Sequence, residues 1–328
     1  MLLVRELRSL LVAVIAAVGA SVSAASTSSQ TLTQVIDGQS VLREYVIRYP
    51  QVRDQSSYPV VFFFHGAGAS SGLNLLNTQL ENLIDTDEFI GVFPTGYDPS
   101  GSNNNRWNVT GETLADDVEF FELILSELAA DPLIDLGRVY AIGRSNGAGM
   151  ANKLGKQKTG LLKGIAPIVS QQVESIGVLA TTEALSVFQV NGDADNVIPI
   201  GGGFIAWLGA TFLSAQASAE NWAASLNCGS IPQSEQLLWG DLSVQAYTYP
   251  DCLESRQVRY HAVEGATHSM SLGQGFDLYA EVWSFFKAQE ALASESVSSV
   301  TVPAVGSFGL LTLGSSMLGL GAFQVRRR

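Results

Sequence analysis

Residues 138–147 read Arg-Val-Tyr-Ala-Ile-Gly-Arg-Ser-Asn-Gly, an apolar run followed by the pattern Gly-x-Ser-x-Gly. The run from Val139 to Ile142 is typical of a strand buried on both faces, and the residues after Ser145 can continue as a helix. A serine on a direct turn from strand to helix is held on a strained bend with its hydroxyl exposed. The stretch therefore predicts an α/β fold with a nucleophile, Ser145, at the carboxyl end of an interior strand.

The same pattern occurs a second time, around Ser70, because three fixed positions match easily in a chain with 32 glycines. Ser70 lies well beyond Phe64, at a point where His65 and Gly66 have already ended the predicted strand. A nucleophile needs the direct turn from strand into helix, which this context does not offer. Ser145 is therefore the better candidate.

Short β-rich runs alternate with helical patterns along the rest of the chain. Helices are predicted at 114–130 and 276–289, where apolar residues recur every three or four positions. The predicted strands lie at residues 43–49, 59–64, 90–93, 138–142, 164–169, 186–190 and 258–263. This alternation predicts a doubly wound, mostly parallel sheet, and residues 35–290 contain no interior linker, so we expect a single domain there.

Composition excludes several classes of protein. The chain has 328 residues, 46% of them hydrophobic and 15% charged, which is enough apolar material for a large core. Its formal net charge of −13 repels phosphate backbones, which argues against nucleic-acid binding. Two cysteines and three histidines cannot complete a tetrahedral zinc site unless carboxylates contribute, so we expect no metal site.

The amino terminus has the pattern of a secretory signal over residues 1–25. Basic residues precede an apolar run, and Val22-Ser23-Ala24 supplies the small residues of a cleavage site. Export leads to an oxidising compartment, which predicts a disulfide between Cys228 and Cys252. We therefore expect an extracellular or cell-surface protein.

The carboxyl-terminal tail, residues 303–328, follows a Ser/Ala-rich linker at 291–302 and contains an 18-residue, mostly apolar stretch from Phe308 to Val325. The stretch is just long enough to span a bilayer, and the terminal Arg326-Arg327-Arg328 would stay in the cytoplasm. Val302-Pro303, the apolar run and the basic end together resemble the PEP-CTERM-like sorting tails of Gram-negative bacteria. The resemblance implies an exosortase-type processing enzyme as a partner, and a plain membrane anchor is the alternative.

A nucleophilic serine needs a base and an acid that orients it, in the chain order serine, acid, histidine for this kind of fold. His268 lies in the loop after the predicted strand at 258–263 and is the expected base, whereas His261 lies inside that strand. Asp193 and Asp195 both follow the predicted strand at 186–190, and position alone leaves the choice between them open.

The run Phe62-Phe63-Phe64-His65-Gly66-Ala67-Gly68 is typical of an oxyanion loop, because an apolar strand ends there in His-Gly and small residues. The backbone N–H groups of Ala67 and Asn146 are expected to stabilise the oxyanion that forms when the serine attacks.

At these residues the chain resembles the α/β-hydrolase group of secreted polyhydroxybutyrate depolymerase-like and feruloyl esterase-like enzymes, close to carbohydrate esterase family 1. The resemblance covers about residues 58–286. It rests on the stretches 63–66, 138–147, 191–199 and 264–268 and on the pair of cysteines.

The resemblance implies an α/β-hydrolase fold and makes Asp195, rather than Asp193, the acid. It also places His65 and Trp107 beside the substrate and supports the disulfide. Trp107 either lines the acyl pocket or packs under the loop, and the sequence leaves this choice open. Asp116-Asp117 matches too, and we interpret the pair as capping the following helix. Two departures, Ala148 among the glycines and Ser269-Met270 after the histidine, obscure the subfamily and the substrate.

The hypothesis from sequence is a serine carboxylic-ester hydrolase that forms an acyl-enzyme and needs no cofactor. A feruloyl esterase-like enzyme that acts on plant polysaccharide is preferred, with a polyhydroxybutyrate depolymerase or an acetyl xylan esterase as alternatives. A peptidase on the same fold and a non-catalytic surface binding protein are the alternatives from other classes. We expect a polymeric substrate and a monomeric protein.

Overall fold

The computed structural model describes residues 27–298, apart from positions 182 and 274 and the side chains of residues 159 and 293–298. The predicted signal at 1–25 and the predicted tail at 303–328 lie outside the described residues. In the part of the chain that is described, no helix combines the length and the apolar character needed to cross a membrane.

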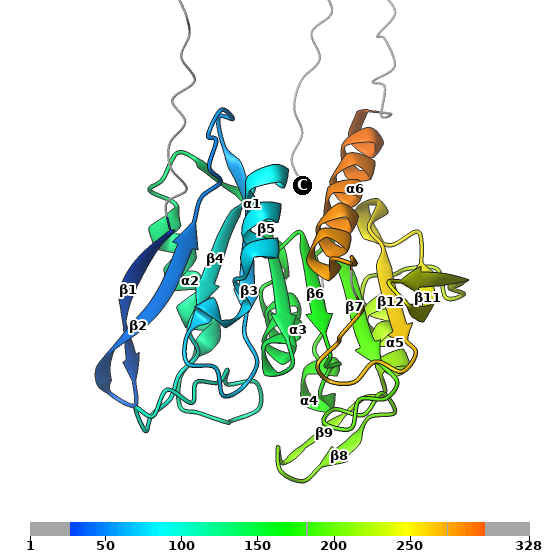
Figure 1. Ribbon diagram of the computed structural model, residues 1–328, viewed down its shortest axis with the longest axis horizontal. Helices are drawn as coiled ribbons and strands as arrows, with labels where there is room; N and C mark the ends of the chain where they lie inside the picture. Colours follow the sequence, from blue (N-terminus) through cyan, green and yellow to red (C-terminus); the bar gives the residue numbers. More distant parts are fainter. Residues whose placement is uncertain (1–26, 182, 274, 299–328) are drawn as a thin grey trace, which may run out of the picture.

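A ten-stranded sheet forms the centre of the molecule, in the order β1-β2-β4-β3-β5-β6-β7-β12-β11-β10 (Figure 1). Neighbouring strands from β4 to β12 in this order are parallel. The β1–β2 and β10–β11 hairpins extend its two sides with antiparallel pairing. The bounds are β1 Thr27–Ile36, β2 Gln39–Arg48, β3 Tyr58–Phe64, β4 Ile90–Pro94, β5 Ile134–Arg144, β6 Gly164–Ile168, β7 Ser186–Gly192, β10 Gln233–Trp239, β11 Leu242–Tyr249 and β12 Val258–Val263.

Every strand predicted from the sequence is present, and the predicted single, doubly wound α/β domain is confirmed. The sequence did not predict β1, β10 and β11, nor a separate small hairpin of β8 (Gly203–Ile205) and β9 (Ala210–Phe212). These strands lack a continuous apolar run: most residues of β10, for example, are exposed. Their pairing partners, which the sequence pattern does not show, determine their structure.

The helices cover both faces of the sheet. Buried side chains of α1 and α6 pack in one core cluster, and those of α2, α3 and α5 pack in the other. In Figure 1, α1 and α6 lie in front of the sheet. The bounds are α1 Thr78–Asp87, α2 Asp117–Leu128, α3 Asn146–Gln157, α4 Glu174–Gly177, α5 Ala215–Ser225 and α6 Leu278–Ser298. Helix α6 thus continues into the segment that was predicted to be a linker from residue 291.

Strand β3 shows how the sheet joins the two cores. All seven of its residues are buried, and successive side chains point to opposite faces. Phe62 packs edge-on against Phe121 of α2, with ring centres 4.8 Å apart. Phe63 points the other way and contacts Phe93, at 4.9 Å, and Tyr279 of α6. Burial on both faces explains why this strand reads as a continuous apolar run.

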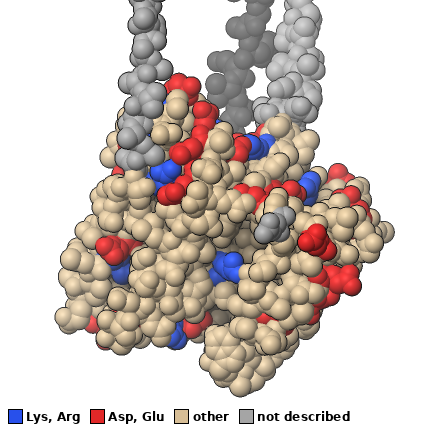
Figure 2. Space-filling model, in the orientation of Figure 1, with Lys and Arg blue, Asp and Glu red and all other residues tan. Residues whose placement is uncertain are grey.

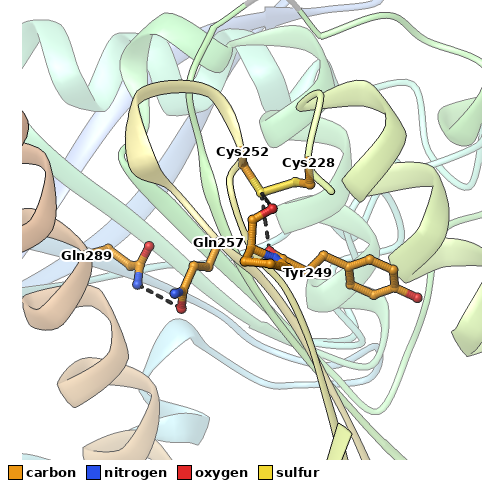
Figure 3. Close-up of a disulfide and its surroundings, with 6 residues drawn as sticks. Cys228, Tyr249, Cys252, Gln257 and Gln289 are labelled. Atoms are coloured by element: carbon orange, nitrogen blue, oxygen red, sulfur yellow. Dashed lines mark hydrogen bonds between the residues drawn. A yellow bond between two sulfur atoms is a disulfide. The ribbon is translucent and has the colours of Figure 1, made fainter. Parts of the chain in front are cut away.

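The predicted disulfide between Cys228 and Cys252 is confirmed (Figure 3). It joins the end of α5 to the segment before β12. Backbone hydrogen bonds flank it, from Gly229 N–H to the Pro250 carbonyl at 2.8 Å and from Leu253 N–H to the Leu226 carbonyl at 2.9 Å. The disulfide therefore links the two ends of the segment that contains the β10–β11 hairpin.

Replacing both cysteines by serine should lower the free energy of unfolding. The cysteines are 24 residues apart, and in the chain-entropy model a loop of this length corresponds to about 3 kcal/mol. Guanidinium chloride titration of the two proteins measures the difference. Reductant should shift the midpoint of the unaltered protein to that of the double variant. Equal midpoints under oxidising conditions would contradict the prediction.

Candidate active site

Ser145 lies on the turn between β5 and α3, as the Gly-x-Ser-x-Gly pattern predicts. Its φ of 56° and ψ of −121° lie where residues with a side chain are rarely found. A Cβ atom on Gly147 would lie 2.0 Å from the Phe64 carbonyl oxygen, and one on Gly143 would lie 2.0 Å from the Gly147 carbonyl oxygen. Both glycines are therefore required for the turn, because each allows backbone to approach backbone.

The structure brings Ser145, His268 and Asp195 together in one line of hydrogen bonds. Ser145 Oγ lies 2.8 Å from His268 Nε2, and His268 Nδ1 lies 2.7 Å from Asp195 Oδ2. Asp195 Oδ1 accepts the N–H groups of Val197 at 2.8 Å and Ile198 at 3.0 Å. With a neutral imidazole, Nδ1 donates to the carboxylate and Nε2 accepts the serine proton, which is the arrangement of a catalytic triad.

The other candidates have different places. Asp193 accepts the N–H of Gly265 at 2.7 Å, so it holds the loop that carries His268. His261 is buried in β12 between aromatic rings, and burial lowers its pKa to about 3. The Ser70 hydroxyl is exposed and donates to Asn74 Oδ1 at 3.3 Å.

Ala67 and Asn146, whose backbone amides are the expected oxyanion-hole donors, both line the pocket beside Ser145. Among the described residues, the Ala67 N–H has no hydrogen-bond acceptor. The Asn146 N–H is the first amide of α3 and has no partner within the helix. Both donors are therefore available to an oxygen that develops negative charge at this point.

The expectation that His65 and Trp107 contact the substrate is wrong, because both side chains are fully buried. His65 Nε2 accepts the Gly96 N–H at 2.9 Å, and burial lowers the pKa of His65 to about 4, so the ring is neutral at pH 7. Trp107 Nε1 donates to the His65 carbonyl at 2.9 Å. The two rings therefore pack in the core against the loop that follows β3 and contains Ala67.

The side chain of Asn146 connects this support to the nucleophile. Its Oδ1 accepts the Trp107 N–H at 2.6 Å and its Nδ2 donates to the Trp107 carbonyl at 3.1 Å. The residue after Ser145 is thus held by two hydrogen bonds to the segment whose ring supports the oxyanion loop. We found no sequence signal for this contact beyond the motif itself.

Asp116 caps α2 as predicted, by accepting the N–H groups of Val118 and Glu119. Asp117 does not: it is buried and forms an ion pair with Arg43 of β2, 2.7 Å between Nη2 and Oδ1. The other oxygen of Asp117 accepts the N–H of Asn108, next to Trp107, at 2.6 Å. The prediction for Asp117 was wrong because Arg43 comes from a distant part of the chain.

Two hollows meet at Ser145. The first, the apolar pocket, lies between the β8–β9 hairpin and the loop after Trp107, and its apolar walls are Val109, Val173, Ile198, Trp207, Leu208 and Phe212. The second, the open groove, runs along Gly66–Ala69 and past Arg144, His268 and Ser269. Trp207 is 66% exposed at the tip of the hairpin. The sequence gives no indication of this hairpin wall.

The triad geometry and the parallel sheet with an antiparallel extension define an α/β-hydrolase fold. Solved structures that share it include an acetyl xylan esterase from Aspergillus awamori (TM-score 0.55, 13% identity, 79% of this chain and 99% of that one) and a putative dipeptidyl aminopeptidase IV from Bacteroides ovatus (TM-score 0.52, 15% identity, 80% and 36%). At these identities the likeness shows the fold alone.

Curated relatives are esterases. The chain is 25% identical to feruloyl esterase B of Piromyces equi over 58% of its length and 37% of that protein. It is 26% identical to feruloyl esterase D of Neurospora crassa over 53% and 59%. It is also 26% identical to a probable feruloyl esterase C of Aspergillus clavatus over 75% and 84%. The chain thus spans less than two thirds of the length of the first two relatives. No family model matches it.

Arg144, which the sequence analysis passed over, links the nucleophile to the histidine loop. Its Nη2 donates to the carbonyls of His268, at 3.2 Å, and Ser269. Among the described residues, these two carbonyls have no other donor. Asp193 fixes the beginning of the same loop through its hydrogen bond from Gly265. Arg144 and Asp193 thus hold the loop on either side of His268, and each lies close in sequence to a triad member.

Arg144→Met should lower kcat by about 10²-fold, a loss typical of a misplaced catalytic group, with little change in KM or Tm. The loss should be larger for a methyl ester than for a p-nitrophenyl ester, because p-nitrophenolate leaves without a proton from His268. Arg138→Met, at the opposite end of β5, is the control and should behave like the unaltered protein. Equal losses on both esters would mean that Arg144 only supports the fold.

Proposed function

We propose that this protein is a serine carboxylic-ester hydrolase that releases acyl groups from plant polysaccharide, with feruloyl esters as the preferred class. The observation that carries the proposal is the continuous hydrogen-bonded line from Ser145 through His268 to Asp195, with two free amides beside the serine. The names of the curated relatives support the substrate class.

The geometry accounts for each step of the reaction. Ser145 Oγ attacks the ester carbonyl carbon while His268 Nε2 takes its proton, and Asp195 stabilises the imidazolium that forms. The amides of Ala67 and Asn146 bind the tetrahedral oxyanion, and each such donor is typically worth about 2.7–4 kcal/mol of barrier. His268 then protonates the leaving alcohol. A water molecule, activated by His268, attacks the acyl-enzyme and releases the acid.

The two hollows suggest how an ester would lie across Ser145. The apolar pocket is lined mostly by apolar side chains and suits the acyl group, whereas the open groove suits a hydroxyl-rich leaving group. On the face shown in Figure 2, charged side chains are more frequent in the upper half than near the lower edge, where Figure 1 places the β8–β9 hairpin. The part of the pocket wall that the hairpin supplies, Trp207, Leu208, Ala210 and Phe212, carries no charge, which is compatible with a neutral polymer.

Export, processing of the tail by an exosortase-type enzyme and a monomeric state remain proposals from the sequence. An acetyl xylan esterase and a polyhydroxybutyrate depolymerase use the same triad, so both remain alternatives for the substrate. A binding protein would not need the three side chains in working geometry, and the observed distances favour an enzyme.

Ser145→Ala should reduce hydrolysis of methyl ferulate by several orders of magnitude, because the nucleophile of the acyl-enzyme is lost. The unaltered protein should be tested in parallel on acetylated xylan, polyhydroxybutyrate and a peptide amide, and methyl ferulate should give the highest kcat/KM. Labelling by a fluorophosphonate should occur at Ser145 and disappear in the variant. Full activity in the variant would remove Ser145 from the mechanism, and faster amide turnover would identify a peptidase.

Trp207→Ala should raise KM for methyl ferulate about 10-fold and leave p-nitrophenyl acetate hydrolysis nearly unchanged. An indole ring on the pocket wall can contact a planar acyl group, and such a contact is worth on the order of 1 kcal/mol. The ring does not reach an acetyl group. Phe204→Ala is the matched control: Phe204 is 67% exposed on the same hairpin and does not line the apolar pocket. Equal effects of both variants would assign Trp207 only a role in folding the hairpin.

A further inference from the structure

A third hollow lies at the edge of the sheet opposite the triad, at the amino ends of β5, β6 and β12. Its lining includes four cationic side chains: Arg138, Lys163, Arg256 and Lys287. Arg138 and Ser145 are seven positions apart, with β5 between them, about 20 Å at the rise of a β-strand. This basic hollow is therefore separate from the catalytic site.

Such a concentration of positive charge stands out in a chain with 18 Lys and Arg against 31 Asp and Glu. Two of the four cations are paired with carboxylates outside the lining: Arg138 Nε lies 2.7 Å from Asp135 Oδ2, and Lys287 Nζ contacts Asp87. Lys163 has no side-chain partner among the residues that the structure describes. Two cations thus remain to be balanced.

Arg256 is the unusual member of the set. Its side chain lines the hollow, yet the residue is only 5% exposed, and its buried Nε and Nη1 atoms have no hydrogen-bond partner. Within the described part of the chain it forms no ion pair. Buried charges in proteins are almost always paired, because an uncompensated charge out of water is strongly destabilising.

The backbone holds Arg256 in this position. It follows Cys252 of the disulfide by four residues, and its N–H donates to the Leu253 carbonyl at 3.1 Å. Figure 3 shows the next residue, Gln257, reaching towards Gln289 of α6, with 3.2 Å between Nε2 of Gln289 and Oε1 of Gln257. The guanidinium is thus carried on a segment that is cross-linked to α5 and tied to α6.

One carboxylate, Glu290 of α6, also lines the hollow. It accepts the hydroxyl hydrogen bond of Tyr140 and makes no ion pair with Arg256. Its charge offsets one of the two unbalanced cations. An excess of one positive charge remains around the hollow, and the buried donors of Arg256 are still unsatisfied.

We propose that the basic hollow binds a phosphate group, with Arg256 and Lys163 as its main ligands. A guanidinium offers several donors in a planar fork that matches two phosphate oxygens, and a lysine adds a point charge. The phosphate can be free or part of a phospholipid headgroup. On α6, the last described element of the chain, the hollow adjoins Lys287, Glu290 and Ala291.

Thermal unfolding in inorganic phosphate, against chloride at equal ionic strength, tests the proposal. Phosphate at several times Kd should raise Tm of the unaltered protein by about 2–4 °C. Arg256→Gln and Lys163→Gln should abolish the rise and leave esterase activity unchanged. Lys158→Gln, which removes an equal charge from a surface pair with Glu122, is the control and should keep the rise.

Glu290→Gln should tighten phosphate binding several-fold, because it removes the repelling carboxylate and keeps a group that can accept the Tyr140 hydrogen bond.

Sedimentation with phosphatidylglycerol or phosphatidylcholine vesicles distinguishes a lipid headgroup from free phosphate. A loss of phosphatidylglycerol binding in Arg256→Gln would identify a headgroup. If Arg256→Gln still binds phosphatidylglycerol vesicles but no longer shows the rise in Tm with inorganic phosphate, the ligand is free phosphate. No shift in Tm, or the same shift in Arg256→Gln as in the unaltered protein, would overturn the proposal.

Discussion

The close contact between the first turn of α3 and the carboxyl end of β3 is the constraint on which the site depends. The Phe64 carbonyl oxygen occupies the space of a side chain at Gly147, so the helix can pack directly against the strand. This packing holds Ser145 at a positive φ, a strain of order 1–3 kcal/mol that the surrounding core maintains. The same contact brings the amide of Asn146 alongside the loop of Ala67. Nucleophile and oxyanion donors are thus positioned by one feature of the backbone.

Most of the residues that maintain this geometry do not reach the substrate. His65 and Trp107 support the oxyanion loop from within the core, and Asn146 clamps the backbone of Trp107. The Arg43–Asp117 pair extends this support to β2, because Asp117 also holds the amide next to Trp107. Polar networks of this kind are stabilising only when every member is satisfied, and none of these five side chains has a buried atom without a hydrogen-bond partner.

The two edges of the sheet differ in chemistry. The carboxyl edge carries the triad, an apolar pocket and an open groove, and its polar groups are arranged around one reacting hydroxyl. The amino edge carries a cluster of four cationic side chains, although the chain as a whole is acidic. One of the four is the buried guanidinium of Arg256. Because β5 runs from one edge to the other, the two regions are held at a fixed separation by the same strand.

Local patterns were enough to predict the interior strands, the nucleophile, the base and the cysteine pair. Each is marked by an apolar run, a glycine spacing or a position after a strand. The choice of Asp195 over Asp193 needed a family resemblance, and the structure supports it by giving Asp193 a separate hydrogen bond to Gly265. The edge strands, the wall formed by Trp207, the buried roles of His65 and Trp107, and the partners of Asp117 and Arg144 were decided only by tertiary structure. Each of these depends on contacts between residues far apart in the chain, and burial and pairing are properties of the folded neighbourhood rather than of the local sequence.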